Sequence, residues 1–226
     1  MIVRRIRLGP FAAVLLTVSV ALAGCSSAEN GKGSVGPAAG PSAGSTAAGT
    51  APPRDLTSQL FTVSELPAGW AVDNSAANSS TDTTPPCLAS VKAKVEPALK
   101  ADADFVKGTD FPALSQHIGD FGTSAAASST FAAMTSTLDR CTDVSFTSEG
   151  TKITGSIGQM SFAKLGDRSE AWQMVLSAQG QTVGIDLVLV QRNRELELLL
   201  YGELGSPDVG EFTALASKAV AKLPSS

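Results

Sequence analysis

The sequence predicts an α+β domain in which an antiparallel β-sheet of about five to seven strands packs with two or three α-helices and carries one disulfide. Three observations lead to this prediction. The C-terminal half alternates apolar and polar residues over long stretches, as strands do. Separate segments repeat apolar residues at helical spacing, and two cysteines, Cys87 and Cys141, lie in the part of the chain expected to fold.

Two helices are predicted in the first half of this domain. The clearer one follows the start signal Thr123-Ser124 and runs into Cys141; its apolar stripe is Ala127, Phe131, Met134 and Leu138. The weaker one opens at Cys87 after Pro85-Pro86, and Pro97 is expected to kink or shorten it; its stripe is Leu88, Val91, Val95 and Leu99. A Cys87–Cys141 bond would pin both helices to one side of a sheet.

The C-terminal half is expected to form hairpins. Its long alternating runs are residues 171–176, 183–189 and 196–200, and the short polar connections Gln179-Gly180-Gln181 and Arg192-Asn193-Arg194 indicate antiparallel pairing. Earlier strands are expected near residues 144–154 and 158–164.

A last helix closes the predicted domain. It is expected to start with Ser206 as cap and Pro207 at the first helical position, and its apolar face is Val209, Phe212, Leu215, Ala219 and Leu223. The predicted order is therefore strand, helix, strand, helix, four or five antiparallel strands and a final helix.

The N-terminus has the features of an export signal. A basic start is followed by an apolar core over residues 11–20 and by Leu22-Ala23-Gly24-Cys25, which resembles a bacterial lipobox. Residues 1–24 are thus predicted to be a lipoprotein signal peptide, and Cys25 the lipid-bearing first residue of the mature protein. An uncleaved anchor and a freely secreted product remain the alternatives. Lipidation predicts attachment to the cell membrane, for example through palmitate, on its extracytoplasmic face.

Residues 25–55 are predicted to be a tether, and residues 56–224 a single globular domain. Gly, Ala, Ser, Thr and Pro dominate residues 26–53, so this segment has too little apolar surface to offset its ordering entropy. Removing three arginines with the leader lowers Lys+Arg from 17 to 14 while Asp+Glu stays at 21, which takes the net charge from −4 to −7. This balance argues against nucleic acid as a partner.

Export to an oxidising compartment favours pairing of Cys87 with Cys141 in a structural disulfide. A redox or nucleophilic pair is the alternative, but the CxxC spacing typical of such pairs does not occur in the sequence. Trp70 and Trp172 are the candidate ligand-binding residues, because aromatic side chains often line binding sites. Core packing is the competing role for both.

No catalytic residue, metal site or cofactor is predicted. The chain has a single histidine, His117, and no Gly-x-Ser-x-Gly elbow, so a serine triad is not expected. Asp102, Asp104 and Asp110 form a small acidic group, which is interpreted as a solvated loop because the spacing of a calcium loop is missing.

Several of these features together resemble a known family. The segment from Phe61 to Trp70 (FTVSELPAGW), the cysteine opening a helix at Cys87, the helix running into Cys141 and the β-meander before a terminal helix are similar to actinobacterial lipoproteins related to the extracellular sensor domain of PknH-type kinases. The resemblance implies an antiparallel sheet flanked by helices, with a cleft for an unidentified ligand.

Two functions are expected on these grounds. The first is a non-enzymatic binding or sensor-like module that takes a small molecule, a lipid or an envelope component as its ligand. The second is a structural or adaptor lipoprotein that binds another cell-envelope protein.

Overall fold

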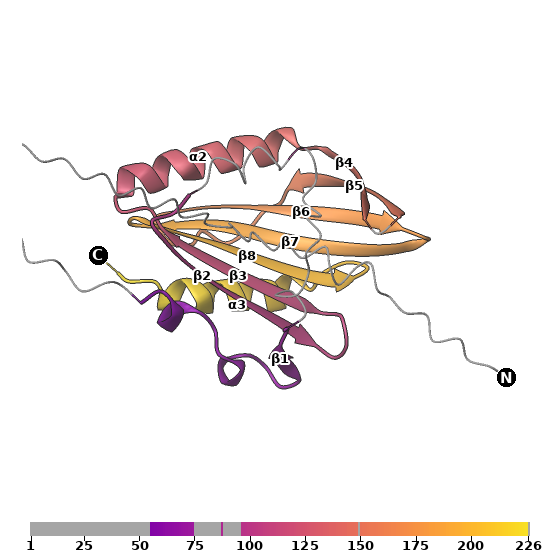
Figure 1. The fold of residues 1–226 in the computed structure, drawn as a ribbon, viewed down its shortest axis with the longest axis horizontal. Helices are drawn as coiled ribbons and strands as arrows, with labels where there is room; N and C mark the ends of the chain where they lie inside the picture. The colour runs from indigo at the N-terminus through magenta and orange to yellow at the C-terminus, as the bar shows by residue number, and fades with distance from the viewer. Residues whose placement is uncertain (1–54, 75–86, 88–95, 149, 226) are drawn as a thin grey trace, which may run out of the picture. The chain divides into compact units, whose positions relative to one another are not determined.

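The computed structural model describes residues 55–74, 87, 96–148 and 150–225. Two single-turn 3-10 helices open this part of the chain, and two α-helices and eight strands follow (Figure 1). Their bounds are η1 Thr57–Gln59, η2 Val63–Glu65, β1 Trp70–Val72, β2 Leu99–Lys107, β3 Ala113–Asp120, α2 Ser124–Arg140, β4 Asp143–Ser148, β5 Thr151–Gln159, β6 Arg168–Ala178, β7 Gln181–Arg192, β8 Glu195–Leu204 and α3 Val209–Lys222.

All eight strands belong to one antiparallel sheet, in the order β1-β2-β3-β8-β7-β6-β5-β4. The two predicted hairpins are confirmed. Gln179 and Gly180 join β6 to β7 with φ of 51° and 80°, and Asn193 has φ of 55° in the turn between β7 and β8. Turns with positive φ match the twist of the strands they connect, which is why short loops favour Gly and Asn there.

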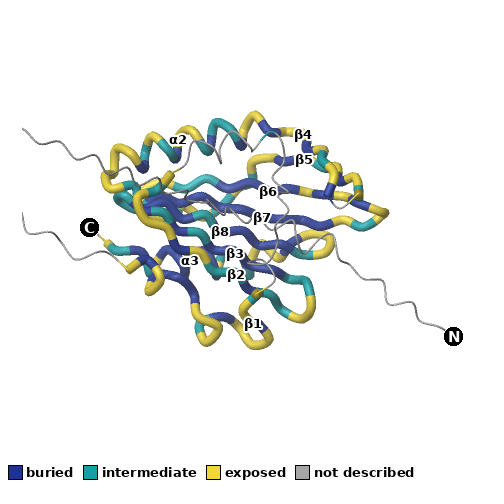
Figure 2. The backbone as a smooth tube through the Cα atoms, viewed as in Figure 1, coloured by how far each residue is buried: buried dark blue, intermediate teal, exposed yellow. Residues whose placement is uncertain are grey.

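The two α-helices lie on opposite faces of the sheet (Figure 1). We call the face under α2 the α2 face and the other the α3 face. Neighbouring residues of one strand alternate between them: Val188 packs with the α3-side cluster, and Leu189 with the α2-side cluster. The middle strands are therefore buried on both sides, as the dark blue along most of β7 and β8 shows (Figure 2).

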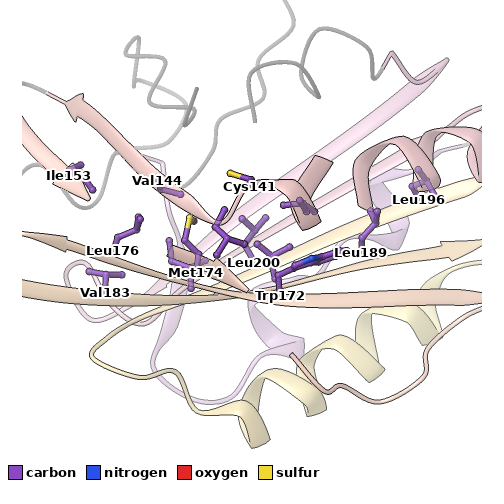
Figure 3. Packing of buried hydrophobic residues seen from close by; sticks show 14 of the residues in the cluster. Cys141, Val144, Ile153, Trp172, Met174, Leu176, Val183, Leu189, Leu196 and Leu200 are labelled. Carbon is purple, nitrogen blue, oxygen red and sulfur yellow. The ribbon is translucent and has the colours of Figure 1, made fainter. Parts of the chain in front are cut away.

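The core of the α2 face is a large apolar cluster built on β5 to β8. Trp172, Met174 and Leu200 lie in it, with α2 packed above them (Figure 3). The helix contributes the predicted stripe, of which Phe131 is fully buried, and Met134 lies at its margin. Thr123 caps the helix as predicted, since its Oγ1 accepts a hydrogen bond from the Ala126 N–H at 3.1 Å.

The core of the α3 face gathers the apolar side of α3, the inner side chains of β2, β3, β7 and β8, and the first described segment of the chain. We call that segment, residues 55–66, the N-terminal strap. Its Leu56, Leu60, Phe61 and Leu66 are all buried. Phe212 of α3 is also fully buried, against the rings of Phe162 and Tyr201.

The sheet has more strands than the five to seven predicted. The missed strand is β2, whose Asp102 and Asp104 were assigned to a solvated loop together with Asp110. That assignment was wrong for the first two residues, because β2 turns them toward the α2 face and pairs them with β3. Leu99 opens β2 and does not belong to a helix. Cys87 itself is helical, and the rest of that predicted stripe, Leu88, Val91 and Val95, lies outside the described residues.

Two further boundaries differ from the prediction. The strands expected near residues 144–154 and 158–164 are a single hairpin, β4–β5, which has Gly150 with φ of 78° in its turn; residues 160–164 form no strand. Asp208, not Ser206, caps α3: its Oδ1 accepts from the Gly210 and Glu211 N–H groups. The carboxylate is one residue from the first helical turn, where it reaches both donors.

Candidate functional site

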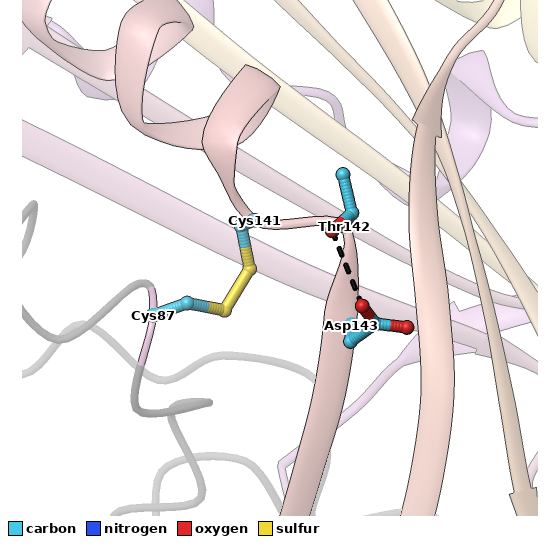
Figure 4. Close-up of a disulfide and its surroundings, with 4 residues drawn as sticks. All are labelled: Cys87, Cys141, Thr142 and Asp143. Carbon is cyan, nitrogen blue, oxygen red and sulfur yellow. Dashed lines mark hydrogen bonds between the residues drawn. A yellow bond between two sulfur atoms is a disulfide. The ribbon is translucent and has the colours of Figure 1, made fainter.

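The predicted disulfide is present and joins Cys87 to Cys141 with 5.6 Å between their Cα atoms (Figure 4). Cys141 is the C-terminal cap residue of α2 and belongs to the buried α2-face core, against which the partly buried Cys87 packs. The adjoining residues Thr142 and Asp143 lead directly into β4. The bond therefore links the Cys87 segment to the junction of helix and sheet, and neither sulfur is a free thiol.

Trp172 lies at the centre of the α2-face core. It is fully buried, and its Nε1 donates a hydrogen bond to Asp139 Oδ1 on α2 at 2.9 Å. The contact satisfies the buried indole N–H and ties the last turns of α2 to β6.

Trp70 lies on the α3 face, 6.3 Å from the ring of Tyr201 between centroids. Its Nε1 is buried and makes no hydrogen bond with any described residue. The two tryptophans therefore occupy separate cores on opposite faces of the sheet and do not line one site together. A role for either in ligand binding stays a prediction.

The chain's single histidine faces the α2 side of β3. His117 Nδ1 lies 2.7 Å from Asp102 Oδ1 on the paired strand β2. The neighbouring hydroxyl on the same side, Ser115 Oγ, donates to Asp104 Oδ1. Burial raises the pKa of the Asp104 carboxyl, against the lowering effect of that hydrogen bond. The serine is thus bound to a carboxylate of its own, and the two pairs are separate cross-strand contacts.

The described residues hold no group of three His, Cys, Asp or Glu side chains placed to bind a metal ion.

A polar cluster of a different kind lies on the α3 face under the N-terminal strap. Gln116 of β3 is fully buried and accepts a hydrogen bond from the Phe61 N–H at 2.7 Å. Its Nε2 donates to Glu197 Oε1 of β8 at 2.7 Å, with the Gln59 carbonyl oxygen a longer contact at 3.4 Å. One amide side chain therefore connects the strap backbone to a buried carboxyl group.

That carboxyl group is strongly perturbed. Burial raises the pKa of Glu197 to about 7, and the nearby negative charge of Glu195 acts in the same direction. The hydrogen bond from Gln116 and the charge of Lys222 oppose the rise without cancelling it. Glu197 is thus poised to exchange a proton near neutral pH.

A second buried carboxyl group occupies the same face closer to the start of α3. Asp186 of β7 accepts a hydrogen bond from Gln173 Nε2 at 2.8 Å, and burial raises its pKa. Beyond it, the α3 face of β4 to β6 is exposed and carries a row of hydroxyls, one on each strand from β4 to β7: Ser145, Thr154, Ser177 and Thr182.

The chain matches no family model and no curated protein. The fold is similar to that of the extracellular domain of PknH from Mycobacterium tuberculosis. The alignment has a TM-score of 0.55 and 12% sequence identity, and it covers 74% of this chain and 93% of that domain. The resemblance expected from the sequence is therefore confirmed for the fold, and for the fold alone.

Sequence reasoning missed the cluster of Gln116 and Glu197. The alternation of Leu196, Leu198 and Leu200 indicates one buried face for this strand and by itself gives no sign that Glu195 and Glu197, on the other face, are buried. Because the strand is covered on both sides, Glu195 and Glu197 are buried as well. A visible signal was the continuous apolar run Leu198-Leu199-Leu200, which is typical of a strand buried on both faces.

Proposed function

We propose that the protein is a lipid-anchored, extracytoplasmic module that binds or senses a ligand and is not an enzyme. The observation that carries the proposal is the Cys87–Cys141 disulfide, held within a fold similar to the extracellular domain of PknH. Disulfides persist in oxidising compartments outside the cytoplasm, so the bond supports an exported protein. The sensor-like role follows the fold-level resemblance.

The lipobox-like Leu22-Ala23-Gly24-Cys25 supports the anchor, although this segment lies outside the described residues. Among the described helices, none has the length and hydropathy needed to cross a bilayer. Cys25→Ala tests the anchor directly. We expect this variant to be misprocessed or released from the membrane fraction, while Cys141→Ala in the same host stays there. Unchanged retention of the Cys25 variant contradicts lipidation.

The absence of enzymatic activity is proposed from the contacts of the candidate groups. His117 is paired with Asp102, and the hydroxyl on its side of the strand is bound by Asp104. A histidine base activates a serine through a hydrogen bond to that serine, which this arrangement does not provide.

Native mass spectrometry of the mature protein, purified from its own host, tests ligand binding. We expect a reproducible added mass on the folded domain. A sample unfolded and refolded in clean buffer serves as the matched control and should lose that mass. A bare domain in repeated preparations contradicts the binding function.

An adaptor that binds another envelope protein is the second candidate, favoured by one observation. The hydroxyl row on the α3 face of β4 to β6 is exposed, whereas α3 packs on β7 and β8. Crosslinking in cells through a photoreactive residue at Thr154 should capture one protein if this face is an interface. Capture there together with a bare domain in the mass spectrum would favour the adaptor.

A further inference from the structure

Glu197 presents a hydrogen-bonding mismatch inside the α3 face. Its Oε1 accepts from Gln116, but its Oε2 is buried and has no hydrogen-bond partner among the described residues. The Gln59 Oε1 atom on the strap is also buried and has no hydrogen-bond partner among the described residues. Both atoms are acceptors, and unsatisfied buried acceptors are costly. A proton on Glu197 turns one of its oxygens into a donor and removes the negative charge at the same time.

The N-terminal strap is held close to this carboxyl group by hydrogen bonds and apolar contacts, without strand pairing. Phe61 donates its backbone N–H to Gln116, which in turn donates to Glu197. Leu56 and Leu60 pack in a small apolar cluster with Ala101, Ile118 and Leu223. The strap contains only two single-turn helices, η1 and η2, and no strand. It can therefore separate from the sheet without breaking the β-ladder, although Phe61 and Leu66 then leave the core and Glu65 leaves Lys222.

Several charged groups lie on the elements around Glu197, but among the described residues no cation forms an ion pair with it. These charged groups are Glu195, Asp120, Arg192, Arg194, Lys218, Lys222, Glu65 and Asp55. The cations are engaged elsewhere: Lys222 Nζ lies 2.7 Å from both Glu65 carboxylate oxygens, Arg194 pairs with Asp120 at 2.7 Å, and Arg192 donates to the Val220 carbonyl. Lys218 donates to the Glu65 carbonyl.

We propose that Glu197 is a proton-binding site that controls the docking of the N-terminal strap. With the carboxyl group protonated, the strap stays docked through Gln116 and Phe61. Ionisation leaves a carboxylate with one unsatisfied oxygen in a site closed to water, and lifting the strap is the way to hydrate it. Release also uncovers the apolar cluster that Leu56 and Leu60 cover.

Release of the strap would change the length of the connection between the predicted anchor and the sheet. The strap directly follows the 54 residues that contain the predicted lipid site Cys25, so its release lengthens the free chain between anchor and sheet. The protein would then hold its domain on a shorter connection in acid than at alkaline pH. The docking of the strap through Glu197 does not depend on the proposed ligand or anchor, whereas the change in connection length rests on the proposed anchor.

Hydrogen exchange of the strap, followed by mass spectrometry on the full chain in detergent, tests the proposal. The rates are divided by the intrinsic exchange rates at each pH, which gives the opening constant of the segment. Between the ordinary carboxyl pKa of 4.5 and the docked value of about 7, one linked proton predicts a rise of about tenfold per pH unit in that constant, and the constant should level off above pH 7. Peptides from β7 provide the internal reference and should show no such rise.

Two variants sharpen the experiment. Glu197→Gln keeps the shape of the side chain and supplies a permanent donor, so its strap should show no rise in opening with pH. Glu170→Gln removes the same charge from β6 and should behave as the wild type. A flat profile in the wild type, or a rise that survives in Glu197→Gln, overturns the proposal.

A direct titration covers the case in which Glu197→Gln does not fold. The carboxyl carbon of Glu197 in the wild type, followed by NMR, should titrate with a pKa of about 6 or above. A lower value overturns the proposal, because the group would then be ionised throughout the range in which the strap is docked.

Discussion

The α2 face of the sheet buries apolar side chains and a few neutral polar groups, one of which is a hydrogen-bonded amide, whereas the α3 face also buries the carboxyl groups of Glu197 and Asp186. The amide is Gln191, which donates to Ser128 Oγ at 2.8 Å and also contacts backbone carbonyls. Neutral, satisfied groups do not change with pH. On the other face burial raises the pKa of Glu197 to about 7, so the packing of that face depends on pH in the neutral range; on the α2 side, burial also raises the pKa of Asp104 on β2.

This division also separates the fixed part of the molecule from the part that can respond. The disulfide secures the end of α2, so the α2 face is constrained both by covalent linkage and by packing. The α3 face is closed at one end by the N-terminal strap, which carries no disulfide and does not itself pair with a strand of the sheet. The strap on the α3 face can therefore open locally while the rest of the domain stays folded.

The largest expected effect is the loss of a core phenylalanine from the fixed face. Phe131 is fully buried and its ring lies 4.5 Å from the Arg168 guanidinium carbon. Phe131→Ala should lower the free energy of unfolding by about 3–5 kcal/mol, measured by guanidinium denaturation. The loss should be equal at about pH 5.5 and pH 8. Phe212→Ala is the matched variant on the α3 face, and a Phe131 effect that varies with pH would contradict the division drawn above.

Removal of the disulfide should have nearly as large an effect. The bond joins residues 54 apart in sequence, and the chain-entropy relation for such a loop predicts a loss of about 4 kcal/mol. The double variant Cys87→Ala with Cys141→Ala, compared with Cys25→Ala under non-reducing conditions, measures it. A loss below about 1 kcal/mol would mean that α2 is held by packing alone.

Glu197 should give the α3 face a pH-dependent stability. Its folded pKa of about 7 exceeds the ordinary value of 4.5, so the folded state binds the proton more tightly. The resulting stabilisation is complete below about pH 4.5 and is lost as pH rises through about 7, by about 3 kcal/mol in all. The pairing with Lys222 lowers the pKa of Glu65 from 4.5 to about 2, so the stability that it contributes is lost only as the pH falls from about 4.5 to 2. This range does not overlap the range in which Glu197 titrates.

Unfolding free energies of the wild type and Glu197→Gln across this range check that expectation. The variant should lack most of the decline, and a smaller one should remain because burial also raises the pKa of Asp186 and Asp104. Glu170→Gln should reproduce the wild-type curve. A Glu197 variant whose stability falls as steeply as that of the wild type would show that the titrating group lies elsewhere.

The elements that the sequence predicted well are those that bury a single apolar face or depend on local turn geometry. The α2 stripe from Ala127 to Leu138, its cap at Thr123 and the hairpins around Gln179-Gly180 and Asn193 depend on local geometry and on one buried face. The same holds for the pairing of Cys87 with Cys141, because the two cysteines of the predicted domain allow only one connectivity.

The parts that escaped prediction depend on what lies across the sheet. Strand β2 carries Lys100, Asp102 and Asp104 on one side, a pattern typical of a loop until His117 and Ser115 of β3 are placed opposite the two carboxylates. The buried Glu197 is likewise unremarkable in sequence. Only the strap and α3, which are distant along the chain, close the α3 face over it.

The smallest effects should come from the helix caps. The cap of α2 is neutral and the cap of α3 is a carboxyl group, the same contrast as between the buried polar groups of the two faces. Thr123 caps α2 with one neutral hydrogen bond, whereas the Asp208 carboxylate accepts two from the first turn of α3, at 2.8 and 3.0 Å. Thr123→Ala should cost about 1 kcal/mol and Asp208→Ala somewhat more, because the charge also interacts with the helix dipole. Salt screens only the charged part. Thermal denaturation should therefore show the Asp208 effect shrinking at high ionic strength while the Thr123 effect stays constant, and equal salt dependence of the two would contradict a charge contribution at α3.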